Sequence, residues 1–196
     1  MSLLPGYSGP MTEHEAVNVA LIASLLPPLP NALNIDQNVA AASAWRILMA
    51  ESRIVQAQEW HFNRSFNRRF DPIEDGTIPA PDGLLMVVFD GGQYVVRSQK
   101  IFDRYNSTFV IGKPIVATEV VELLPWDELP IHAQHYIAYR AARIMAVPRL
   151  GAQDAKEAVK INEQQALVAL EQADAKLDGP NAKHHSGTMG RWSRHK

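Results

Sequence analysis

The sequence predicts an α+β fold, in which an antiparallel bundle of about four helices carries a small, mainly antiparallel β-sheet. Apolar residues recur at helical spacing before residue 60 and again after residue 130. Between residues 71 and 125, prolines and glycines separate short apolar and β-branched runs, which is typical of strands and turns. The sheet is therefore expected as an insertion between the second and third long helices.

Composition limits the class of protein. The chain has 196 residues, of which 46% are hydrophobic and 20% are charged, and this composition is typical of a soluble globular protein. A net charge of -2 argues against a nucleic-acid binder held by bulk charge. The absence of cysteine excludes disulfides, cysteine-ligated metals and a cysteine nucleophile. Neither a transmembrane helix nor a signal peptide is expected.

The first two helices and the exit from the second are predicted from local patterns. Thr12 can accept a hydrogen bond from the amide of Glu15 in a capping box, and the helix that follows ends near Leu26, before a proline-rich turn. A second, longer helix follows a short connection, which favours antiparallel neighbours. Large side chains occupy successive positions from Trp60 to Asn63, so we expect the chain to leave the helix there as an extended segment.

The inserted region contains several strand candidates. The apolar run at residues 84–89 predicts a buried strand, and the turn pattern of Asp90, Gly91 and Gly92 predicts a hairpin that returns through residues 94–96. Further strands are expected at residues 101–102, 109–111 and 115–123.

Two more helices complete the chain. The third begins near residues 126–130, where Asp127 and Glu128 suit the positive end of a helix and Pro130 suits its first turn. The last covers residues 152–177 and stops before Pro180. The expected organisation is an N-terminal arm at 1–11, a helical bundle of 12–70 and 126–178, an inserted β region at 71–125, and a flexible basic tail at 179–196.

The sequence contains no strong catalytic or metal-binding motif. Phosphate loops, dinucleotide-binding glycine motifs, nucleophile elbows and HExxH zinc motifs are all absent. His132 and His135 stand three apart on a predicted helix without an identifiable third ligand, so surface or packed histidines are the favoured interpretation. Acidic residues among prolines and glycines usually serve turns, and a glycosidase pair among them is the enzymatic hypothesis: Asp71, Glu74, Asp75 and Asp82. No catalytic residue, metal or cofactor is predicted.

Two groups of residues leave alternatives open. Trp60, Phe62 and Phe66 either close the core where helix meets sheet or form a stacking platform with the interleaved arginines; the buried stripe before them favours the core. The tail has no acidic residue after position 180, and it is either a solvated terminus or a segment that orders against a partner. Its candidate contact residues are Lys183, Arg191, Trp192 and Arg194.

The order of the motifs resembles the tail tubular protein A family of short-tailed bacteriophages. Residues 44–48 (AWRIL) and 60–63 (WHFN) are similar to the A-R-I-L and G-W-x-F-N signature of that family. Segments 79–84, 101–103, 127–130 and 136–143 resemble further family segments in the same order, over residues 12–175. Glu59 departs from the family, which often has glycine there. The family-motif core residues are Trp45, Ile47, Leu48, Trp60, Phe62, Asn63, Leu129, Pro130 and Tyr136.

The resemblance implies a virion structural protein without enzymatic activity. Such a protein is a head-to-tail adaptor that forms a ring, commonly a dodecamer, between the portal protein and the tail nozzle (tail tubular protein B). Its helical part would lie near the portal and its sheet toward the nozzle, and genome DNA would pass through the bore without sequence-specific binding. The implied location is the virion tail, after assembly in the host cytoplasm, with no membrane partner. The alternatives are a tail-associated hydrolase acting on bacterial surface polysaccharide and a helical scaffold unrelated to phages.

Overall fold

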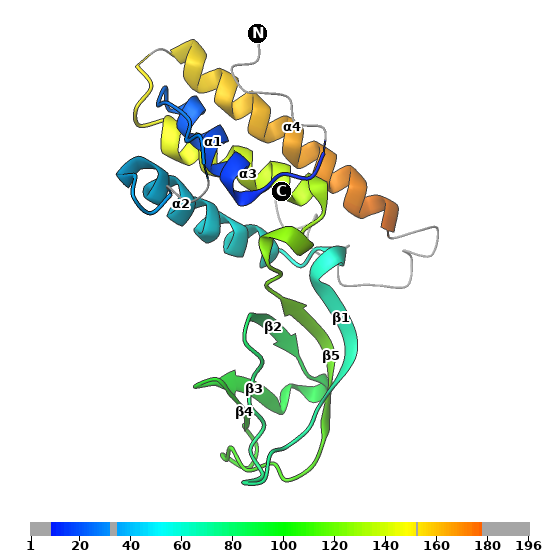
Figure 1. Ribbon diagram of the computed structural model, residues 1–196. Helices are drawn as coiled ribbons and strands as arrows, with labels where there is room; N and C mark the ends of the chain where they lie inside the picture. The colour runs from blue at the N-terminus through cyan, green and yellow to red at the C-terminus, as the bar shows by residue number, and fades with distance from the viewer. Residues whose placement is uncertain (1–8, 32–34, 152, 178–196) are drawn as a thin grey trace.

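The computed structural model describes residues 9–31, 35–151 and 153–177. Figure 1 shows a bundle of helices from which the β region projects. The bundle contains α1 (Glu13–Ala23), α2 (Val39–Gln56), α3 (Ile131–Ala146) and α4 (Gln153–Leu177). The β region contains β1 (Arg64–Phe70), β2 (Leu84–Val88), β3 (Tyr94–Arg97), β4 (Lys100–Asp103) and β5 (Ile115–Glu122). All five strands lie between α2 and α3, which confirms the predicted α+β fold with an inserted sheet.

Helix α3 is the centre of the bundle, because it packs against α1, α2 and α4. Its buried alanines, among them Ala138 and Ala142, allow the neighbouring helices to approach closely. Larger side chains, including Leu48 on α2 and Leu170 on α4, fill the rest of the core and are almost fully buried. A side chain of that size contributes about 1.5–3 kcal/mol when it is buried.

The chain enters α1 through residues that belong to the core. Met11, which the sequence assigns to an arm, is 1% exposed, and its amide donates to Oε1 of Gln134 at 2.9 Å. Residues 1–8 of the expected arm lie outside the described residues. The predicted capping box is present: the Thr12 side chain accepts from the Glu15 amide, and the Glu15 carboxylate accepts from the Thr12 amide.

Helix α2 ends four residues before the predicted exit at Trp60, and the sheet also begins earlier than expected. Helix α2 ends at Gln56, the short 3-10 turn η2 (His61–Asn63) follows, and β1 starts at Arg64 rather than after residue 70. Strand β1 contains no β-branched residue and is held by antiparallel pairing with β5, a partner distant in sequence. Its composition therefore does not indicate a strand.

Glu59 adopts a backbone conformation that favours glycine, with a φ of 65°. A side chain in this left-handed region costs about 1–2 kcal/mol, and glycine recovers most of it. We therefore expect Glu59→Gly to raise the free energy of unfolding by about 0.5–1 kcal/mol in urea titrations. Glu59→Ala keeps the Cβ atom and is the control. Equal stability of the two variants would contradict the explanation.

The strands form two antiparallel sheets, in the order β1-β5-β2 and β3-β4. The predicted hairpin from residues 84–89 to 94–96 is wrong, because β2 pairs with β5, and β3 pairs with β4. Gly91 and Gly92, both with positive φ, turn the chain through η3 (Asp90–Gly92) before β3 begins. The real hairpin turns at Ser98 and Gln99, whose φ values of 48° and 56° suit a tight two-residue turn without its usual glycine.

The β region has a core of its own. Phe89 lies between Phe70 and Tyr94, with ring centroids 6.0 Å and 5.6 Å away. Residues 109–111, expected as a strand, contribute a single bridge between Val110 and Thr77. The buried side chains of this core are Phe70, Ile78, Phe89, Ile101, Ile115, Ala117 and Val120.

Candidate assembly surfaces

Two chain crossings join the bundle to the β region, and Gln56 holds one of them. This last residue of α2 is fully buried. Its Oε1 accepts from the Leu124 amide at 2.7 Å, and its Nε2 donates to the Leu124 carbonyl at 3.1 Å and to the Ser52 hydroxyl at 3.0 Å. The side-chain amide thus pairs with the backbone that leaves β5 as a neighbouring strand would. We call Gln56 and its partners Ser52 and Leu124, together with Asn63, the joint.

Asn63 holds the other crossing. Its Nδ2 donates to the Gln56 carbonyl at 2.8 Å and to the Glu122 carbonyl at 2.9 Å. One buried amide therefore connects the end of α2, the start of β1 and the end of β5. Asn63 is among the family-motif residues, whereas Gln56 was missed. The signal that could have found Gln56 is its i,i+4 spacing from Ser52 on the buried side of α2.

The aromatic residues before β1 pack between the joint and the bundle. The Trp60 indole donates to the Val55 carbonyl at 2.8 Å and stacks on Phe62, with ring centroids 6.5 Å apart, and both pack on the bundle core. Next to them, the His61 amide donates to Oδ1 of Asp174 on α4 at 2.9 Å. Phe66, on β1, is 49% exposed, with the Arg64 guanidinium over its ring. The structure thus divides the predicted aromatic cluster.

An ion network connects three helices of the bundle. Arg140 on α3 donates to the Glu51 carboxylate on α2 and to the Tyr136 hydroxyl, and lies 3.7 Å from Oε1 of Glu163 on α4. Arg143 pairs with the same Glu163. Burial alone would lower the pKa of Arg140, but its hydrogen bonds to Glu51 and Tyr136 raise that pKa above its ordinary value.

The remaining family-motif residues divide between core and surface. Leu48, Leu129 and Tyr136 are buried in the bundle, and Ile47 is half-buried against it. Trp45 is 37% exposed, and its indole donates to Oε2 of Glu13 on α1 at 3.0 Å. Pro130 is exposed as the N-cap of α3. The predicted contact residues of the tail lie outside the described residues: Lys183, Arg191, Trp192 and Arg194.

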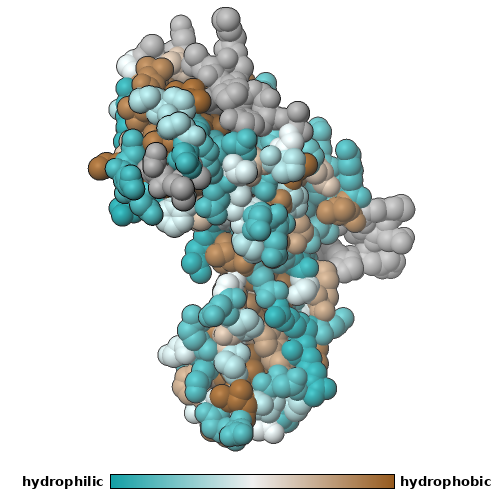
Figure 2. All heavy atoms as spheres, viewed as in Figure 1, coloured by the Kyte–Doolittle hydropathy of each residue, from teal (hydrophilic) through white to brown (hydrophobic). Residues whose placement is uncertain are grey.

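The free end of the β region carries exposed apolar side chains. Ile73, Tyr105 and Val110 are 52%, 71% and 58% exposed, and we call them the tip surface. Figure 2 shows hydrophobic residues at this end of the molecule, along the β region and on the bundle. On the bundle, exposed apolar side chains include Leu25 after α1, Ile131 on α3 and, on α2 and α4, Val39, Trp45, Ile54, Ile161, Val168 and Leu177. On the strands, Phe66, Val88 and Val116 are also exposed. Apolar side chains are thus exposed both on the bundle and in the β region.

A buried carboxylate supports the tip surface. Oδ1 of Asp103 accepts from the Tyr105 and Asn106 amides, and Oδ2 accepts from the side chains of Gln93 and Asn106. Burial raises the pKa of Asp103, but these hydrogen bonds outweigh it, led by the one from the Asn106 backbone, so its pKa lies below the ordinary range.

Acid is therefore expected to loosen the tip. Because the pKa of Asp103 is lowered by folding, its stabilisation is complete above the unfolded-state pKa and disappears as the pH falls through the folded value. Hydrogen exchange should show the Tyr105 and Asn106 amides opening at low pH, and Asp103→Asn should open them already at pH 7. Unchanged exchange in that variant would contradict the role of the carboxylate.

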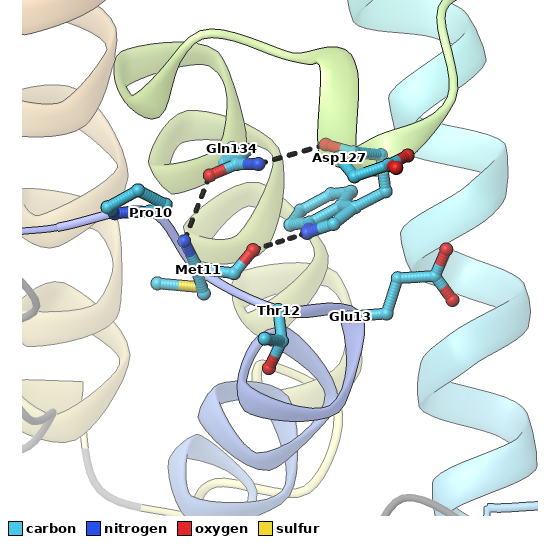
Figure 3. Close-up of a pocket in the computed structure, with 7 residues that line it drawn as sticks. Pro10, Met11, Thr12, Glu13, Asp127 and Gln134 are labelled. Carbon is cyan, nitrogen blue, oxygen red and sulfur yellow. Dashed lines mark hydrogen bonds between the residues drawn. The ribbon is translucent and has the colours of Figure 1, made fainter.

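A pocket of about 320 Å³ lies where α1 and α3 begin. Hydrogen bonds close its wall: the Trp126 indole donates to the Met11 carbonyl, and Gln134 donates to the Trp126 carbonyl at 2.9 Å. Figure 3 shows the carboxylates of Glu13 and Asp127 at the rim. The remaining lining residues are Pro10 and Thr12.

The acidic loop residues serve turns, as the sequence predicts for such positions. Asp71 pairs with Arg69, and Asp75 accepts from the Thr77 amide at 2.8 Å. All four acidic residues are exposed: Asp71, Glu74, Asp75 and Asp82. His135 lies 2.9 Å from the Gly9 carbonyl. Among the described residues there is no group of three or more potential metal ligands.

Comparisons with known proteins identify one family. A family model described as Tube: Tail tubular protein matches residues 14–180, which is most of the chain. A search of curated proteins found none that matches. None of the helices in the described part of the chain is long and apolar enough to cross a membrane.

Proposed function

Because the chain belongs to the tail tubular protein family, and is therefore a structural protein of a bacteriophage tail, we propose that it is the head-to-tail adaptor. In this proposal its copies form a ring, a dodecamer in the virion, between the portal protein and the tail nozzle protein. Genome DNA passes through the bore, and the particle is assembled in the host cytoplasm.

One observation carries the proposal: the chain exposes apolar side chains both on the bundle and in the β region, including the tip surface. Isolated exposed apolar side chains are ordinary, but groups of them usually mark contacts. An adaptor must bind two different partners at once, one on each side. The bundle is assigned to the portal side and to neighbouring copies, and the tip surface to the nozzle.

The joint supports this assignment. A protein that connects two rings must hold its two ends in a fixed relative orientation. The buried side-chain amides of Gln56 and Asn63 hold both chain crossings between the bundle and the β region. A net charge of -2 suits a conduit that releases DNA, because strong phosphate binding requires an excess of basic residues.

The test is electron microscopy of the full chain mixed with the portal protein of the same genome, with each protein also examined alone by light scattering. A coaxial collar on the portal is expected. A portal that stays bare at high concentration, with the two proteins remaining separate, would overturn the adaptor proposal. The mass of the free chain shows whether the ring forms before docking.

The tip surface can be tested by itself. The double variant Ile73→Asp/Val110→Asp adds charge to two exposed positions and is expected to leave the portal collar intact while lowering nozzle binding at least about tenfold, the effect of about 1.4 kcal/mol. Val116→Asp is the control, since Val116 is equally exposed but lies on β5. Binding of labelled nozzle protein to preformed collars measures the effect. Equal affinity of the double variant and the control would remove the tip surface from the interface.

A further inference from the structure

The pocket where α1 and α3 begin is lined by two carboxylates, those of Glu13 and Asp127. Asp127 is exposed, and its carboxylate has no hydrogen-bond or ion-pair partner in the described part of the chain. Glu13 uses one carboxylate oxygen to accept from the Trp45 indole, and its other oxygen has no partner among the described residues. Below this rim, Met11 and Trp126 give the pocket an apolar wall. A fitting ligand has an aromatic or aliphatic group flanked by positive charge.

The chain itself contains such a segment. Residues 1–178 include 15 basic and 21 acidic residues, a net charge of -6, whereas residues 179–196 include four basic residues and no acidic one. Within that stretch, Trp192 stands between Arg191 and Arg194. The charge of the tail is therefore complementary to that of the rest of the chain.

The tail starts close enough to reach the pocket. Asp174, near the end of α4, binds His61, two residues before Asn63 of the joint, and Leu124, two residues before Trp126, binds Gln56 of the joint. The end of α4 and the pocket thus lie at the same end of the bundle. Fourteen residues separate Leu177 from Trp192, and an extended chain of that length spans up to about 50 Å.

We infer that the pocket binds the 191–194 segment of the same chain. The Trp192 indole enters the apolar part, and Arg191 and Arg194 lie against the rim carboxylates. Because the segment is tethered, its effective concentration is in the millimolar range, so even weak contacts hold it in place. A neighbouring copy must compete against this local concentration. This inference is independent of the adaptor proposal, since it concerns the free chain.

The absence of cysteine allows a direct test on the full chain. The variant Pro10→Cys/Ser193→Cys places one thiol at the pocket and one beside Trp192, and Pro10→Cys/Ser186→Cys is the control, with the second thiol outside the segment. Under mild oxidation at low protein concentration, the first variant is expected to form a monomeric disulfide at least about tenfold faster than the control. Adding Trp192→Ala should remove the difference. Circular dichroism of the reduced proteins checks that they are folded.

Three results would overturn the inference: equal rates for the two cysteine pairs, a disulfide-linked dimer as the main product, or a rate independent of Trp192. Hydrogen exchange gives a second measurement without any cysteine. The amides of residues 11–13 and 126–128 should exchange faster in Trp192→Ala than in the unmodified chain, and more slowly again in Trp192→Phe. Unchanged protection would mean that another segment, such as residues 1–8, or no segment occupies the pocket.

Discussion

Replacing Gln56 with leucine is expected to lower the free energy of unfolding by about 3 kcal/mol. The side-chain amide of Gln56 satisfies both the N–H and the C=O of Leu124, at 2.7 Å and 3.1 Å, and it is fully buried. Leucine has a similar size but no hydrogen-bonding group, so both backbone groups of the partly buried Leu124 lose their partner. Each buried group left in this way costs about 1–3 kcal/mol. Urea unfolding followed by circular dichroism measures the loss.

The matched control is Gln58→Leu, two residues further along the chain. Gln58 is exposed, so the same change of side chain should alter stability by less than about 0.5 kcal/mol. Hydrogen exchange then shows whether the loss is local, because the Leu124 amide should open long before the core of the bundle does. If Gln56→Leu were as stable as the control, the joint would be held by apolar packing alone.

The helices could be predicted from the sequence because their determinants are local. The capping box at Thr12 and Glu15, the helical period of apolar residues, and the prolines that end helices all act within a few residues. The family could also be predicted from the sequence, because the resemblance depends on short motifs that occur in the same order along the chain. Glu59 departs from the glycine that the family often has at this position. Its backbone nevertheless keeps the positive φ that suits glycine.

The strand pairing could not be predicted, because it depends on contacts far apart in sequence. Strand β1 has no β-branched residue and is specified by β5, whose Val121 pairs with Arg64. Likewise, the turn pattern at Asp90 predicts that residues 84–89 and 94–96 form a hairpin. In the structure β2 pairs with β5 instead. The joint could not be predicted for a related reason. The backbone partner of Gln56 is Leu124, which follows the whole inserted region in the sequence.

The second large effect is expected from Glu51→Ala. Glu51 is 8% exposed and receives a hydrogen bond from Arg140, so its removal leaves the guanidinium partly buried without its main partner. Breaking a fully buried pair costs about 3–5 kcal/mol. Arg140 is about one quarter exposed and has Glu163 nearby, so we expect a smaller loss of about 2 kcal/mol. Thermal and urea unfolding measure it.

A double-mutant cycle separates the ion pair from simple packing. Arg140→Leu combined with Glu51→Leu removes both charges, so the double variant should be more stable than the sum of the two single losses predicts, by about 1 kcal/mol or more. Glu157→Ala is the control, because Glu157 and Lys160 form an exposed pair on α4, which is worth less than about 0.5 kcal/mol. Strictly additive losses in the cycle would mean that Glu51 and Arg140 act separately. In that case the contact between α2 and α3 would depend on the packing of the buried alanines and leucines around them.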